Sequence, residues 1–414
     1  MPQRLWTVVA AHGVIDWLSA VVVPILTYLE GRVHMTPGQG AILIAVGSIS
    51  SGVIQPIVAL VSDRHDTRWA GTLGLLAAAG AMGSIGFAQD FQQLLLIQIV
   101  GTAGIGAFHP VGAAAAGQLG VGRRGTVISV FYAAGLAGGV LGSFTMPRIV
   151  HAFDLSVLAW AIAPCVLYAG LLAWAIHGVP HRHARAHERH SALAAGERQR
   201  RWRDVSLLFA GNAMRFIVNM MLVQLIKRWC ETRVLGEHGA GELTAELRLE
   251  SSAINGPIQG MMALGMGLSG LALGRLAPMR HAKGVLVGVP VVGVAAVSLF
   301  ALSGSLATAW ALAALMGLGY AAVMPLTITM AQRLLPHRTS LASALMMGGA
   351  WTLAASGPPA AQWMIGSGWS LEVCFLVAAG LLLGSSLLAL PLGPVPEDHH
   401  EGGAARKGTG SRRG

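Results

Sequence analysis

Long apolar runs separated by short polar segments recur along the whole chain. A helix that crosses a bilayer needs about 20 consecutive apolar residues, and these runs have about that length. They predict twelve membrane-spanning helices at residues 6–29, 40–61, 70–88, 92–117, 125–147, 154–177, 204–228, 252–274, 284–303, 306–331, 340–366 and 370–391. The chain is therefore predicted to be an all-α integral membrane protein.

The longest polar break divides the twelve runs into six and six. We expect an N-terminal six-helix half over residues 1–177, a cytoplasmic basic linker over 178–203, a C-terminal six-helix half over 204–392 and a disordered cytoplasmic tail over 393–414. The linker contains the stretch HRHARAHERH, which has two interpretations, a metal-binding histidine tract or a solvated segment beside anionic lipid. We favour the solvated segment.

Composition and charge support this interpretation. Hydrophobic residues make up 54% of the 414 positions and charged residues 11%, whereas soluble domains carry about 25% charged residues. Most of the 28 lysines and arginines lie in loops on the side of the two termini, so the positive-inside rule places both termini in the cytoplasm. The net charge of +10 is spread over short loops, and we expect no nucleic-acid partner. A bacterial inner (plasma) membrane is the expected location.

The two halves resemble each other in sequence. The fourth run contains GIGAFHP and then reaches Arg123 and Arg124, while the tenth contains GLGYAAVMP and then reaches His337 and Arg338. Two six-helix repeats around a site at the membrane midplane are typical of alternating-access transporters.

Four phrases resemble the major facilitator superfamily, and within it the fosmidomycin-resistance branch of drug exporters. They are HGVID in the first run, SGVIQPIVALVSDR ending the second, GTAGIGAFHP in the fourth and MPLTITMAQRLLP in the tenth. The resemblance implies twelve helices in two pseudo-symmetric halves and proton-coupled export. The chain departs from the exporters' pattern in the fifth run, where the glycine series around Gly135 has no Gly-Pro.

The first run carries His12 and Asp16 four positions apart, on one face of a helix. An intramembrane carboxylate beside a histidine is suited to load and release a proton, which makes Asp16 the main candidate proton carrier with His12 tuning it. The alternative is a structural pair that satisfies buried polar groups. The first run is not expected to be a cleaved signal peptide, because it contains these polar residues.

His109 precedes Pro110 in the fourth run, and both are surrounded by small residues. Pro110 removes a backbone donor and loosens the preceding turn, a device found beside transporter sites. We expect His109 to line the cavity and to take part in proton coupling. Its alternative is a histidine that serves packing alone.

Candidate substrate-binding residues follow helical spacing in the second half. Asn212, Arg215 and Asn219 form one stripe in the seventh run. Arg215 cannot readily lose its proton, so it is expected to bind an anionic substrate, to pair with Asp16 across the halves, or to be a snorkelling structural arginine. The other candidates are Gln55 in the second run, Asn255 and Gln259 in the eighth, and Tyr320 in the tenth. Polar groups cluster on the first, fourth and seventh runs, and repeat symmetry adds the tenth, so we predict a cavity lined by these four runs.

By resemblance, Asp63, Arg64 and Arg68 after the second run are candidate gating residues. A helix-end pair that anchors the loop is the alternative interpretation. Cys165, Cys230 and Cys374 lie far apart and match no metal or redox spacing, so neither metal nor cofactor is expected.

These observations predict a secondary transporter for a small amphiphilic or anionic solute, working as a monomer with protons and membrane lipids as partners. Proton-coupled efflux is the favoured mode, with uptake by symport or facilitation as the alternative. A non-transporting membrane sensor or assembly protein on the same fold is the alternative from another class. No enzyme motif such as HExxH or GxSxG occurs, and no repeated polar ring suggests a channel.

Overall fold

The computed structural model describes residues 3–62, 65–120, 124–179, 195–276, 281–321, 324–335 and 338–393, and within these ranges it contains helices and no strand. Eight of the described helices are long and apolar enough to cross a membrane. The elements follow the order of the twelve predicted spans, and the all-α prediction is confirmed.

The N-terminal half contains the first six spans. The first is broken where Pro24 interrupts the helical hydrogen bonds, so α1 is followed by a short 3-10 turn and by α2. Asp90 caps α5 by accepting a hydrogen bond from the backbone N–H of Gln93. The elements are α1 (Gln3–Ser19), η1 (Val23–Ile25), α2 (Leu26–Arg32), α3 (Pro37–Ser62), α4 (Arg68–Gly83), η2 (Ile85–Phe87), α5 (Phe91–Leu119), α6 (Arg124–Phe153), η3 (Leu155–Ala161) and α7 (Ile162–Ile176).

The C-terminal half begins within the predicted linker. Helix α8 starts at Ala195, so residues 195–203 are helical and continue the seventh span, because no glycine or proline separates the basic residues after Gly196 from the apolar run. The elements are α8 (Ala195–His238), α9 (Ala245–Leu276), α10 (Ala282–Phe300), α11 (Leu306–Ala321), α12 (Met324–Leu334), α13 (Thr339–Ala344), a π-helical turn (Leu345–Gly349), α14 (Ala350–Ala354), α15 (Gly357–Gly366) and α16 (Leu371–Leu387). Helix α8 continues past the end of the seventh predicted run, and residues 230–250 are helical except around residues 239–244.

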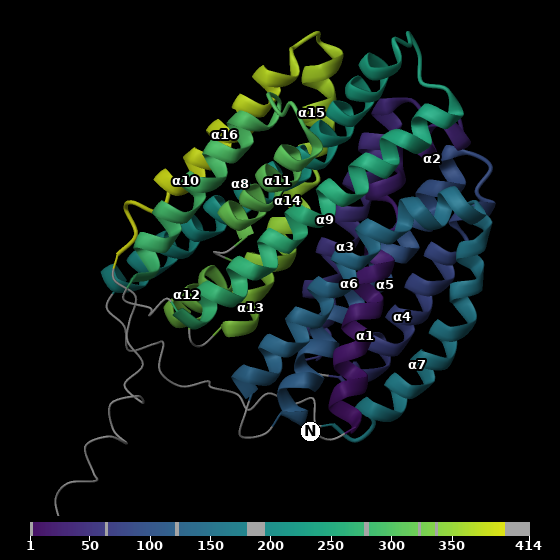
Figure 1. Ribbon diagram of the computed structural model, residues 1–414. Coiled ribbons are helices and arrows are strands. Elements are labelled where there is room, and N and C mark those ends of the chain that lie inside the picture. The colour runs from purple at the N-terminus through teal and green to yellow at the C-terminus, as the bar shows by residue number, and fades with distance from the viewer. Residues whose placement is uncertain are drawn as a thin grey trace, which may run out of the picture.

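The two halves lie side by side, with α9 along their boundary (Figure 1). The largest buried apolar cluster fills the N-terminal half and reaches Phe216 and Met220 on α8. A second cluster fills the C-terminal half around Phe300 and Phe375. Each half therefore has its own core, and α8 joins the two.

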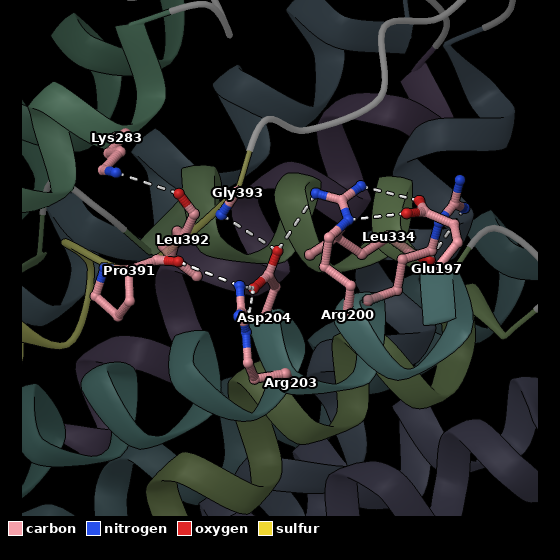
Figure 2. A network of polar contacts seen from close by, with 10 residues as sticks. Glu197, Arg200, Arg203, Asp204, Lys283, Leu334, Pro391, Leu392 and Gly393 are labelled. Atoms are coloured by element: carbon pink, nitrogen blue, oxygen red, sulfur yellow. Dashed lines mark hydrogen bonds and ion pairs between the residues drawn. The ribbon is translucent and has the colours of Figure 1, made fainter. Parts of the chain in front are cut away.

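The bundle has two ends, which we call the α2 end and the N-terminal end. At the α2 end, the amide of Asn255 on α9 donates to the carbonyls of Val23 and Pro24, tying the halves together. At the N-terminal end, Asp204 near the start of α8 accepts hydrogen bonds from Arg203 and from the backbone N–H of Gly393 (Figure 2). This second network fixes the first turns of α8 to the segment that follows α16.

Candidate functional site

Three titratable side chains meet where α1, α5 and α6 pack together. His12 and Asp16 lie one turn apart on α1, and His109 projects from α5 immediately before Pro110. Asp16 is placed between the two histidines: its Oδ2 lies 3.4 Å from His12 Nε2 and its Oδ1 lies 3.2 Å from His109 Nε2. We call these residues the His12–Asp16–His109 cluster.

Both histidine rings are held by backbone carbonyls. His12 Nδ1 lies 2.7 Å from the carbonyl oxygen of Phe131, and His109 Nδ1 lies 2.7 Å from that of Ile105. A carbonyl oxygen accepts and never donates, so each Nδ1 must carry its proton and donate it. In the neutral form of each ring, Nε2 is then a bare acceptor that faces Asp16.

This arrangement requires a shared proton. An ionised carboxylate only accepts hydrogen bonds, so two bare Nε2 atoms beside it would place acceptors against acceptors. One added proton between His109 Nε2 and Asp16 Oδ1 turns that contact into a charge-assisted hydrogen bond. The cluster is therefore built to hold at least one labile proton. Its three ligand atoms lie within 4.8 Å of one another, which is compact enough for a single small cation.

The surrounding side chains bury His12 and leave Asp16 and His109 partly exposed. The side chain of His12 is 3% exposed and stacks on Phe131 with ring centroids 4.0 Å apart. The side chains of Asp16 and His109 are each 22% exposed. Gly135 on α6 makes the close packing possible, because a Cβ there would lie 2.4 Å from the His12 ring and 2.6 Å from Asp16 Oδ2. A proton thus has access to Asp16 and His109, while His12 is fixed behind them.

Arg215 does not join this cluster. Its side chain is buried within the C-terminal half, where Nη2 donates to the carbonyl oxygens of Leu286 and Ser385, each at 3.2 Å. The expected pairing with Asp16 is absent from the described contacts, because the guanidinium points toward α10 and the C-terminal end of α16. Asn212, one turn earlier, donates to the carbonyl of Met346, so it also binds backbone within its own half. Asn219 is buried further along α8.

The remaining amide candidates are distributed over both halves. Gln55 on α3 is partly buried and donates to Ser51 Oγ at 3.4 Å. Gln259 on α9 donates to Asn255 Oδ1 at 3.3 Å, and Asn255 in turn binds the η1 carbonyls. The structure therefore brings Asn255 and Gln259 together at the boundary of the halves. The side chain of Tyr320, on α11, lies outside the described part of the structure.

Of the gating candidates, Arg68 is described and Asp63 and Arg64 lie outside the described residues. Arg68 pairs with Asp66, two positions before it, and Nε lies 2.8 Å from Oδ2. The side chain of Arg68 is 31% exposed and that of Asp66 is 50% exposed, at the start of α4. This contact is local to the loop, and the gating and anchoring interpretations of Asp63 and Arg64 both stay predictions.

The sequence did not lead us to predict a buried ion cluster that lies at the α2 end. Lys227 on α8 contacts Glu30 on α2 and Glu231 on α8, and none of the three side chains is more than 4% exposed. Lys227 lies near the end of the seventh predicted run, residues 204–228, and was not among the candidate residues. The signal that could have identified the cluster is the i,i+4 spacing of Lys227 and Glu231 inside a helix that continues well past residue 228.

Comparison with known proteins assigns the family. The model of the Major Facilitator Superfamily matches residues 6–336 and 239–412. The chain belongs to the Major Facilitator Superfamily. The prediction drawn from the four sequence phrases is thereby confirmed.

Individual relatives agree with this assignment. The Fosmidomycin resistance protein of Escherichia coli (strain K12) is 22% identical over 391 residues, which cover 92% of this chain and 91% of the relative. A bacterial homolog of the human lysosomal transporter Spinster, in an inward-facing and unoccupied conformation, has a TM-score of 0.67 at 15% identity and covers 95% of this chain and 98% of its own. The nucleoside transporter NupG has a TM-score of 0.66 at 10% identity, covering 94% and 99%. The chain is a membrane transporter with the fold of this superfamily.

Proposed function

We propose that this superfamily member is a proton-coupled exporter of a small amphiphilic or anionic solute, with the His12–Asp16–His109 cluster as its proton site. The observation that carries the proposal is the donor pattern of the two histidines. Both Nδ1 atoms are committed to carbonyls, so each contact between a histidine Nε2 and Asp16 becomes a hydrogen bond only when a proton occupies it.

In this proposal Asp16 is the main proton carrier. Both histidines contact its carboxylate, and 22% of its side chain is exposed. His109 shares the proton through its contact with Asp16, and the buried His12 holds Asp16 in position. Loss of the proton leaves Asp16 facing two acceptors, which favours rearrangement of α1 against α5 and so couples protonation to conformation.

The relative's name and the contacts of Arg215 support export as the direction of transport. The relative is named for resistance to fosmidomycin, which supports export as the mode here. Symport would be favoured if Arg215 alternated between Asp16 and an anionic substrate. Its guanidinium donates to two backbone carbonyls instead, which removes the support for that exchange.

Substrate contacts are proposed at the boundary of the halves. The proposed polar groups, on the helices at or next to this boundary, are those of Gln55, Asn219 and Gln259. Repeat symmetry adds Tyr320. We propose a monomer in the inner membrane of a bacterium. The loop charges support a cytoplasmic location for both termini.

The decisive experiment compares Asp16→Asn with the parent in proteoliposomes, using fosmidomycin and a panel of phosphonates, sugars, lipids and amphiphilic drugs as solutes. We expect the variant to lose uphill transport driven by a pH gradient and to keep exchange of solute between equilibrated compartments. Exchange needs alternating access, whereas uphill transport also needs the proton.

The matched control is Asp154→Asn. Asp154 is exposed after α6, where its Oδ1 accepts a hydrogen bond from the Tyr28 hydroxyl at 2.9 Å, and the amide oxygen of asparagine can accept the same hydrogen bond. This control should transport like the parent. Uphill transport by Asp16→Asn at the parent's rate would show that Asp16 is structural and would end the proposal.

A further inference from the structure

The ion cluster at the α2 end joins the two halves. Lys227 Nζ lies 2.9 Å from Glu30 Oε2 in the N-terminal half and 2.8 Å from Glu231 Oε1 in the C-terminal half. Lys227 and Glu231 share helix α8, so they stay together when the halves separate. Glu30 moves away with α2, and it is the member whose surroundings change.

The two carboxylates are satisfied to different degrees. Glu231 accepts hydrogen bonds from Lys227, from Thr27 Oγ1 at 2.9 Å and from Arg228 Nη1 at 3.3 Å. Glu30 accepts from Lys227 through Oε2, while its Oε1 is buried with no hydrogen-bond partner among the described residues. An ionised carboxylate with one bare, buried oxygen loses hydration that nothing replaces. Glu30 is therefore the carboxylate that gains by taking up a proton.

The other charged groups around Glu30 leave this conclusion intact. Arg228 contacts Glu231, and Arg248 on α9 donates to the carbonyl oxygen of Thr27. On α3, the position facing the carboxyl is Gly40, where a Cβ would lie 2.1 Å from Glu30 Oε1. The bare oxygen thus occupies a space that exists because residue 40 has no side chain.

We propose that Glu30 is a second proton-binding site, which takes up a proton at Oε1 when the α2 end closes and releases it when that end opens. In the closed state, Lys227 and Glu231 form a balanced pair, and a neutral Glu30 still accepts from Lys227 through Oε2. In the open state, water solvates Glu30 and favours its ionised form. Raising the pH therefore favours opening of the α2 end. The inference rests on membership of a transporter family and not on the proposed role of Asp16.

The test measures the distance between spin labels at the α2 end of purified protein without solute. Labels are attached at Gln89→Cys and Glu242→Cys, two exposed positions, since Cys165, Cys230 and Cys374 are buried and stay unlabelled while the protein is folded. Between about pH 5.5 and about pH 8.5 we expect the ratio of the long-distance population to the short-distance population to rise roughly tenfold. The upper limit of this change is the ratio of the proton affinities of Glu30 in the closed and open states. Glu30→Gln, which is neutral at every pH, should stay in the short-distance state and lose this rise.

The matched variant is Glu231→Gln, which makes the same change at the other carboxylate that contacts Lys227. Without Glu231, Lys227 relies on Glu30 as its ionised partner, so the pH response should reverse and acid should open the α2 end.

If Glu30→Gln fails to fold, Gly40→Ala replaces it. A methyl group there displaces the carboxyl and should raise the long-distance population at all pH values. Gly38→Ala, whose Cβ would lie 3.8 Å from Thr36 Oγ1, should not do so.

The same measurement in Asp16→Asn separates this site from the proton site between the histidines. We expect the Glu30-dependent rise to persist there, whether or not Asp16 proves to couple transport. A parent with no pH response, a Glu30→Gln variant that keeps the response, or a response abolished by Asp16→Asn would each overturn the proposal.

Discussion

In the N-terminal half, Asp16 contacts two histidines and is partly exposed, whereas in the C-terminal half Arg215 is buried and donates to the carbonyls of Leu286 and Ser385. Both are charged residues inside a membrane-spanning helix. The partners differ in a decisive way, because a histidine changes its protonation near neutral pH and a peptide carbonyl does not. The comparison indicates that a charged residue inside the membrane is a candidate for coupling proton binding to transport when titratable side chains contact it. Four variants test this difference between the halves, from the largest expected effect to the smallest.

The largest effect is expected for His109→Gln. It removes the partner that shares a proton with Asp16, and a charge-assisted hydrogen bond of this kind contributes about 1.5–3 kcal/mol. Proton-driven accumulation in proteoliposomes should fall roughly tenfold or more. His151→Gln, at an exposed histidine in the last turn of α6, should leave accumulation unchanged. Equal accumulation by His109→Gln and the parent would remove His109 from the coupling site.

A second test concerns the packing that holds the cluster together. A Cβ at Gly138 would lie 1.9 Å from the carbonyl oxygen of Gly13, so Gly138→Ala must push α6 away from α1. Overpacking of this kind costs about 1–3 kcal/mol and should lower the Tm, followed with a fluorescent maleimide that reacts as the three buried cysteines become exposed. At Gly139 the nearest atom to a Cβ is the Asp16 carbonyl oxygen at 3.9 Å, so Gly139→Ala is the control. Equal Tm values for the two variants would contradict the close approach of these helices.

The third test is Arg215→Met, which removes the charge and keeps a long side chain. None of the ion pairs found in the described part of the chain includes Arg215, but methionine cannot donate to the carbonyls of Leu286 and Ser385, and a buried acceptor left without its donor costs about 1–3 kcal/mol. We expect the free energy of unfolding to fall by about that amount and proton-driven transport to continue. Folded Arg215→Met protein that no longer transports would restore Arg215 as a substrate or coupling residue.

The smallest effect is expected for Arg68→Gln. Its pairing with Asp66 is local and partly exposed, and ion pairs at the surface contribute about 0–1 kcal/mol. Transport rate and Tm should match those of the parent at physiological salt. A marked loss of transport with unchanged Tm would support the gating role that the resemblance implied for Arg68.

Several features of the site were predictable because they depend on neighbours along one helix. The four-residue spacing of His12 and Asp16 places them together on any helix, and Pro110 marks His109 as unusual in the same way. The spans were predictable because every backbone polar group in hydrocarbon must be satisfied within its own helix. The continuation of α8 from Ala195 was missed because the basic residues there were assigned to a linker.

The sequence by itself determined the all-α membrane fold and the family, because these follow from apolar run lengths and motifs. The tertiary structure decided which charges meet. It placed His109 against Asp16 from another helix, turned Arg215 toward backbone carbonyls, and buried Glu30 beside Lys227 across the boundary of the halves. Such contacts depend on how helices distant in sequence pack and rotate against one another, and helical spacing within a single span carries no information about that rotation.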